Sequence, residues 1–192
     1  MNPKHGNLPE AELASLTKTP NTPEREDRFE RASEKELENI RGFITTRATE
    51  FQKRSGLEID DIRINLISRI YLNRNSDIGT AFEDFLDMYR QIKLEESSLY
   101  DKLEINISFD DSAIDELIRQ SIETGEETGH LTFQLAKKLE YGLKLVKDRS
   151  GTQNFIINRQ AVTDMEKYIN SLVTKFYRDE YEPYKIENHE KD

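Results

Sequence analysis

The chain has 192 residues, of which 35% are hydrophobic and 34% are charged, and its formal net charge is −10. This length predicts one domain with an appendage, a modest core and much solvated helix surface. The acidic balance argues against a nucleic-acid partner, and the absence of cysteine excludes disulfides, thiolate metal sites and thiol nucleophiles. Because no run approaches about 18 apolar residues and no signal-peptide core occurs, we expect a cytoplasmic protein with no membrane partner.

Proline positions divide the chain into tails and an ordered interval. Four of the five prolines lie within the first 23 residues, and the fifth lies close to the C-terminus. The long interval between them is therefore free for regular structure. We expect disordered tails at 1–22 and 181–192. Between the tails, the sequence predicts a helical extension over 23–100 and a second domain over 101–180.

Three amphipathic helices are predicted in the extension. Thr22-Pro23 suits a helix start, with threonine as the cap and proline at the first helical position, and Gly56 suits its end. Asp60-Asp61 caps a second helix, and the third begins at Ser76 or Asp77. The apolar residues at helical spacing, which we expect to be buried, include Ile40, Ile44, Phe51, Ile62, Leu66, Ile67, Ile70, Phe82, Phe85, Leu86 and Ile92.

Residues 103–173 predict a strand–helix–helix–strand–helix unit. Leu103 to Phe109 alternates apolar and polar residues, which indicates a half-buried strand. Asp110-Asp111 suits the cap of the next helix, and the turn at 124–129 separates it from a second one. The fold class is therefore α+β and predominantly α-helical, with N-terminal helices followed by a unit that contains a small sheet.

The end of this unit is predicted from shorter signals. A loop covers 148–153, and a second short strand covers Asn154 to Asn158. Thr163 to Glu166 matches a capping box, which predicts that the last helix begins at Thr163. Three tyrosines near its end, Tyr177, Tyr181 and Tyr184, form either a docking edge or an exposed helix end.

No phosphate-binding loop is predicted. The nearest approach is the segment Gly125 to Gly129, which His130 and Leu131 follow in place of lysine and a hydroxyl residue. Its own glutamates would repel a triphosphate, so we interpret it as a turn between helices. Asp110-Asp111, at the end of the alternating strand, is interpreted as a helix cap and not as a magnesium site.

The remaining ionisable residues predict no catalytic, cofactor-binding or metal-binding residue. Histidine occurs at three positions, two of them in the tails, and His130 is expected to be a capping or surface residue. Glu95-Glu96 and Glu126-Glu127 are paired carboxylates that so acidic a chain produces by chance. An enzyme built from scattered acids or tyrosines stays open as one alternative.

Residues 103–173 resemble the C-terminal small domain, or lid, of AAA+ unfoldases of the ClpX and HslU type. The matching features are the strand and cap at residues 107–111, the Thr128-Gly129 turn, and the helix from Leu135 to Leu143. In that family an Ala-Arg follows the Thr-Gly pair, and its arginine reaches the nucleotide phosphates. This chain has His130-Leu131 there, and residues 1–102 contain no ATPase domain, so the resemblance does not imply nucleotide hydrolysis.

The resemblance predicts a non-catalytic protein–protein interaction module that lacks the ATPase core and needs no cofactor. Such a chaperone-associated module would bind a protein partner, or associate with itself, through apolar helix faces. The alternative is a free-standing acidic helical adaptor or regulatory protein, unrelated to AAA+ ATPases, that binds a basic partner.

Overall fold

The structure is a computed structural model that describes residues 23–74 and 77–181, and the side chains of residues 35–74 and 77–175. Predictions for 1–22 and 182–192, and for the tyrosine side chains beyond residue 175, lie outside these ranges. The elements are α2 (Pro23–Ser55), α3 (Asp61–Arg74), α4 (Ile78–Leu103), β1 (Asn106–Phe109), α5 (Asp111–Thr124), α6 (Thr128–Ser150), β2 (Asn154–Ile157), α7 (Arg159–Thr163) and α8 (Met165–Tyr181). The predicted fold class, predominantly helical α+β, is confirmed.

Aspartate caps begin three of these helices where the sequence predicts them. The Asp60 carboxylate accepts a hydrogen bond from the Arg63 amide at 2.9 Å, at the start of α3. Asp77 caps α4 and Asp110 caps α5 in the same way. Each carboxylate satisfies an amide that has no partner within its own helix, which is why these residues locate helix starts in a sequence.

The start of the last helix was predicted wrongly. Thr163 is the final residue of the short helix α7, and its hydroxyl donates to the carbonyl of Arg159. The next residue, Asp164, instead accepts from the amide of Lys167 and begins α8. The capping box is therefore absent, because the aspartate one position later makes the cap.

Two helices run further than predicted. Leu103 is not in the strand: it is the last residue of α4, fully buried like Leu99 one turn earlier, and Glu104 ends the helix with a φ of 59°. Similarly, α6 continues to Ser150 and shortens the predicted loop, and Gly151 ends it in the left-handed conformation that suits glycine. In α4, buried apolar residues at helical spacing extend the helix into the region assigned to the strand, whereas α6 extends through polar residues up to the glycine that ends it.

The two strands form a parallel sheet in which Asn106 pairs with Asn154 and Phe109 with Ile157. Alternate residues of each strand are buried, which confirms the half-buried strand. Side chains from helices satisfy both outer edges. The Phe109 amide donates to Glu96 at 2.7 Å, and the Tyr168 hydroxyl donates to the Ile156 carbonyl at 2.8 Å.

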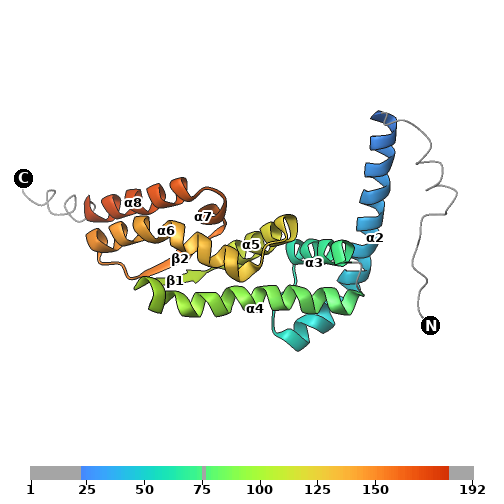
Figure 1. Cartoon of the computed structure of the whole chain (residues 1–192), viewed down its shortest axis with the longest axis horizontal. Helices are drawn as coiled ribbons and strands as arrows, with labels where there is room; N and C mark the ends of the chain where they lie inside the picture. The colour runs from blue at the N-terminus through green and yellow to red at the C-terminus, as the bar shows by residue number, and fades with distance from the viewer. Residues whose placement is uncertain (1–22, 75–76, 182–192) are drawn as a thin grey trace, which may run out of the picture.

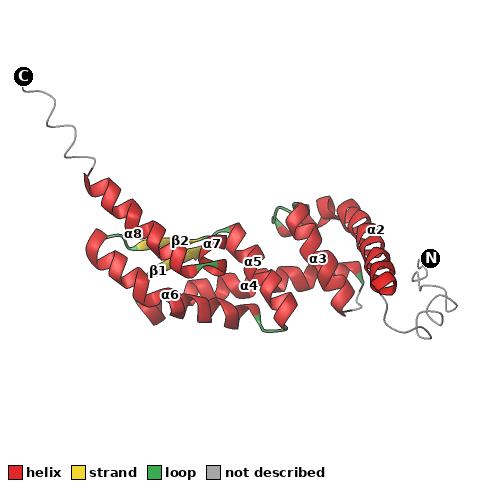
Figure 2. Cartoon of the chain, turned by 90° about the horizontal axis from the view of Figure 1, so that it is seen from above, coloured by secondary structure: helices red, strands yellow, loops and turns green. Residues whose placement is uncertain are grey.

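Helix α4 packs against most of the other elements in the described part of the chain. It packs against α3 at one end and against β1 and α6 along its length (Figure 1). Figure 2 shows α2 and α8 at opposite ends of the molecule. The buried apolar side chains form one continuous core from α2 to α8, so α4 carries the core across the predicted boundary at residue 100. No helix within the described ranges has the length and apolar character needed to cross a membrane.

Replacement of Tyr168 by phenylalanine tests the anchoring of α8 to β2. Tyr168→Phe removes the side-chain donor to the Ile156 carbonyl, and we expect the free energy of unfolding to fall by about 1 kcal/mol at neutral pH. Burial raises the pKa of Tyr168 from 10.0 to about 12, so the wild type loses stability in that range while the variant does not. Urea unfolding from neutral to alkaline pH should show that the difference in the free energy of unfolding between the wild type and Tyr168→Phe becomes smaller.

Tyr141→Phe is the matched control, since the side chain of Tyr141 is 81% exposed. This variant should unfold like the wild type. An equal loss of stability in both variants would contradict the anchoring role of Tyr168.

Candidate functional site

A groove with a volume of about 480 Å³ lies where α2, α3, α5 and α7 meet. It is the junction between the N-terminal helices and the unit that contains the sheet (Figure 1). Its lining residues are Arg41, Asp61, Ile62, Asn65, Leu66, Arg69, Ser112, Asp115, Glu116, Arg119 and Arg159. The lining thus combines four arginines, three carboxylates and two aliphatic side chains.

Two helix faces with the same residue spacing form the walls of the groove. Helix α3 contributes positions 62, 65, 66 and 69, and α5 contributes positions 112, 115, 116 and 119. Spacings of three and four place the residues of each set on one helix face. The opposite face of α5 buries Ile114, Leu117 and Ile118 in the core. The core therefore covers the apolar face of α5, and the opposite face of α5, which lines the groove, is polar.

Arg63 and Asp115 form a buried ion pair beneath the groove. The Arg63 Nε donates to Asp115 Oδ1 at 3.0 Å, and the two side chains are 3% and 9% exposed. Arg63 Nη1 donates to the Glu58 carbonyl at 2.7 Å, and the guanidinium lies 5.7 Å from the centre of the Tyr89 ring. Burial raises the pKa of Asp115, and the positive charge of Arg63 offsets part of that rise. The pair joins α3 to α5 against a side chain of α4.

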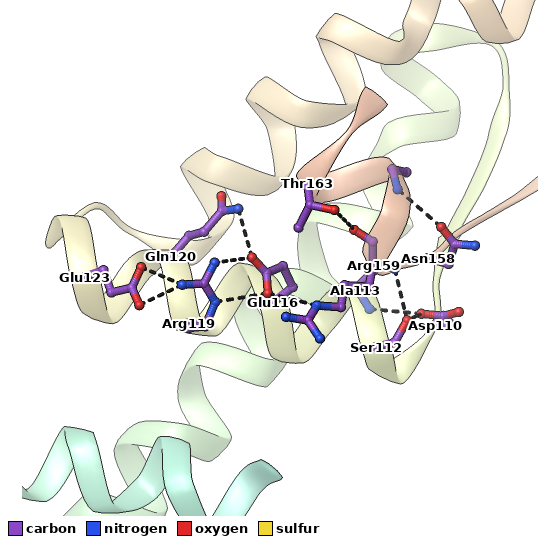
Figure 3. A network of polar contacts seen from close by, with 11 residues as sticks. Asp110, Ser112, Ala113, Glu116, Arg119, Gln120, Glu123, Asn158, Arg159 and Thr163 are labelled. Atoms are coloured by element: carbon purple, nitrogen blue, oxygen red, sulfur yellow. Dashed lines mark hydrogen bonds and ion pairs between the residues drawn. The ribbon is translucent and has the colours of Figure 1, made fainter. Parts of the chain in front are cut away.

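A second buried carboxylate, Glu116, accepts hydrogen bonds from several side chains (Figure 3). Arg119 Nε and Nη2 both donate to it, and Arg159 Nε lies 3.3 Å from Oε2. Arg119 also contacts Glu123 through Nη1 at 2.7 Å. The hydrogen bond from Arg119 is the main cause that lowers the pKa of Glu116. Glu116 thus connects α5 to α7 as a charged group.

Three other polar groups of the lining have a weak partner or none among the described residues. Arg41 makes no ion pair with any residue in the described ranges, and Arg69 reaches Glu123 at 3.4 Å. The Oδ1 of Asn65 is buried and receives no hydrogen bond from a described residue. The groove therefore offers a bound molecule arginine donors, acceptors at Asp61 and Asn65, and the exposed aliphatic side chain of Ile62.

These groups suit binding better than bond-breaking chemistry. Both buried carboxylates are engaged by arginines, so neither is positioned as a free base. Among the described residues, no three histidine, aspartate or glutamate side chains come close enough to share a metal ion.

The residues that the sequence singles out lie elsewhere. Gly125 ends α5 with a φ of 76° and Gly129 lies in the first turn of α6, so the segment is a turn between helices, as interpreted. Thr128 is buried and donates to Gln91 of α4. His130 is exposed and contacts Gln134, as expected of a surface residue. None of these residues lines the groove.

Sequence reasoning missed the groove residues for two reasons. Ile62 was expected to be buried but is 58% exposed, because it lies on the groove face of α3. Asp115-Glu116 was not singled out among the paired carboxylates, although it is the buried pair. The sequence feature that could have identified this pair is the set of polar residues at positions 112, 115, 116 and 119. These positions recur at helical spacing, on the face of the helix opposite its apolar stripe.

Removal of one partner from the buried ion pair should be strongly destabilising. Arg63→Ala leaves Asp115 as an uncompensated buried charge, and we expect the free energy of unfolding to fall by about 3–5 kcal/mol. The double variant Arg63→Met with Asp115→Leu removes both buried charges and should be close to the wild type, because Asp111, the other carboxylate that contacts Arg63, is 67% exposed and can be solvated. Chemical denaturation measures all three proteins.

Arg69→Ala is the control for arginine loss, since its contact with Glu123 is exposed and should contribute at most about 1 kcal/mol. If the double variant is as unstable as Arg63→Ala, the loss reflects packing and not the unpaired charge.

The stability provided by Glu116 should depend on pH. Its pKa lies below the ordinary value of 4.5, so the folded state favours the charged form. This contribution is present above that value and is lost as the pH falls through the lower folded pKa. Glu116→Gln should therefore be less stable than the wild type at neutral pH, and the difference in the free energy of unfolding should shrink as the pH falls below 4.5. A constant difference across this range would contradict the charge-based role.

Comparison of the chain with protein-family models, with curated proteins and with solved structures found no match.

Proposed function

We propose that this chain is a non-catalytic protein–protein interaction module whose binding surface is the groove between α2, α3, α5 and α7. The observation that carries the proposal is the composition of the groove. An exposed aliphatic side chain, Ile62, lies in a concave lining that also contains four arginines. Aliphatic and arginine side chains together are typical of protein-binding surfaces, where arginine is enriched and buried apolar area stabilises the complex.

We also propose that the module is similar to the lid of AAA+ unfoldases and acts in the cytoplasm in association with chaperones. The order β1–α5–α6–β2–α8 supports this proposal, because it reproduces the predicted strand–helix–helix–strand–helix arrangement. The short helix α7 is an addition to that order. His130 and Leu131 occupy the positions at which the resemblance would place the phosphate-binding arginine, so the proposed role is binding of protein and not of nucleotide.

Site-specific cross-linking tests the proposed function. A photoreactive phenylalanine analogue at position 62 should yield a discrete protein adduct in living cells, because that side chain would lie inside the interface. The same analogue at position 141, which is 81% exposed and outside the groove, is the matched control. Mass spectrometry identifies the adduct as another protein or as a second copy of this chain.

Either protein adduct, specific to position 62, is the expected result. No adduct above the control, or an adduct with nucleic acid, would contradict the proposed function.

A further inference from the structure

We propose that the groove binds an acidic peptide segment in which carboxylates flank an apolar side chain. The carboxylates would contact Arg41 and Arg159, and the apolar side chain would cover Ile62. This inference rests on the proposed function and adds the chemistry of the partner.

Arg159 has unused hydrogen-bonding capacity at one end of the groove. Its side chain is 66% exposed, and its ionic contact is through Nε, to Glu116 Oε2 at 3.3 Å. Its two terminal nitrogens donate no hydrogen bond to a carboxylate in the described ranges, and Figure 3 shows the guanidinium beside Glu116. A guanidinium binds a carboxylate best through two parallel donors, so Arg159 can accept a second carboxylate without releasing the first.

Arg41 supplies a second cation from the other end. It projects from α2, whereas Arg159 belongs to α7, and α3 and α5 lie between these two helices (Figures 1 and 2). No carboxylate in the described ranges pairs with Arg41. A segment that crosses α3 and α5 would therefore pass from one arginine to the other.

Between the two arginines, α3 presents one exposed aliphatic side chain and one acceptor without a donor among the described residues. Ile62 is 58% exposed and Leu66, one turn further along α3, is buried beside it. Asn65 Oδ1, on the same helix face, has no donor among the described residues. An apolar side chain would cover the aliphatic surface, and a peptide N–H would satisfy this acceptor after a small movement of the amide.

The free hydrogen-bonding capacity of the lining arginines favours an acidic partner over a basic one. Arg63 beneath the groove pairs with Asp115 and Asp111, and Glu123 beside it pairs with Arg69 and Arg119. The cations with donors left for a ligand are therefore Arg41 and Arg159. The whole chain carries −10, but at physiological salt exposed charges beyond about 8 Å are largely screened. Contacts inside the groove, and not the total charge, therefore decide which segment binds.

The test is a titration of the full-length, isotope-labelled protein followed by NMR. The probe is the peptide acetyl-Asp-Glu-Leu-Glu-Asp-amide. Two controls have the same length, one with Asn-Gln-Leu-Gln-Asn and one with Lys-Lys-Leu-Lys-Lys. We expect the acidic peptide alone to shift amide signals of α3 and α5, and we expect weak binding because few contacts are made. Equal shifts with the neutral peptide, or stronger shifts with the basic one, would overturn the proposal.

Paired variants identify the cations. Arg41→Gln with Arg159→Gln should weaken binding of the acidic peptide by at least about tenfold. Arg54→Gln with Arg90→Gln removes the same charge from exposed positions outside the groove and should leave binding unchanged. Thermal unfolding of both pairs verifies that the fold is intact. Equal effects of the two pairs would overturn the assignment to Arg41 and Arg159.

The remaining outcomes name other occupants. A dimer that dissociates in Arg41→Gln with Arg159→Gln would identify a second copy. Peptide binding seen only after deletion of residues 1–22, which contain Glu10 and Glu12 among leucines, would identify the chain's own segment. Either result overturns the acidic partner. If the cross-linked adduct at position 62 persists in Arg41→Gln with Arg159→Gln, only the partner chemistry proposed here is overturned. If no adduct forms at position 62 with both arginines present, the proposed function itself is contradicted.

Discussion

The buried contact between Arg63 and Asp115 determines how the N-terminal helices meet the unit that contains the sheet. Arg63 donates to Asp115 on α5 and to the Glu58 carbonyl just before α3, and its flat guanidinium lies near Tyr89 on α4. One side chain therefore relates three helices. A lysine could not replace it, because an ammonium group has neither the planar shape nor the fixed fork of donors. The groove depends on this contact, since it places the matching faces of α3 and α5 opposite each other.

Polar residues on the second face of α5 explain why a groove exists there at all. An apolar face at positions 112, 115, 116 and 119 would pack directly against α3 and fill the space between them. Buried carboxylates instead require arginines: Arg63 is buried with Asp115, and Arg119 is partly exposed beside Glu116. Burial of Asp115 and Glu116 adds little net stability, because the cost of desolvation opposes the attraction. The structural consequence of burying these two carboxylates is that α5 is held to α3 through Arg63 and to α7 through Arg159.

Local signals in the sequence were sufficient for most of the fold. Asp60, Asp77 and Asp110 predict helix starts because a cap needs only a side chain and an amide three residues later. The boundary errors at Leu103 and Thr163 arose where two local patterns competed for the same residues. The groove could not be predicted in this way, because it requires the separation and orientation of residues such as Ile62 and Arg159, which lie far apart in the chain. Periodicity shows that Ile62 shares a helix side with Leu66, but not that α5 leaves this side open.

The Glu116 carboxylate repels an acidic ligand, but it also holds Arg119 and Arg159 in fixed positions from which they can bind one. Glu116 fixes Arg119 through two nitrogens and restrains Arg159 through Nε, so these side chains lose little conformational freedom when a ligand arrives. Freely rotating arginines would carry the same charge but would lose more entropy on binding. The carboxylates also reduce the local positive charge, which limits affinity for polyanions that interact through charge alone. A groove of this kind therefore discriminates by the positions of carboxylates relative to an apolar side chain, and the total charge of the ligand matters less.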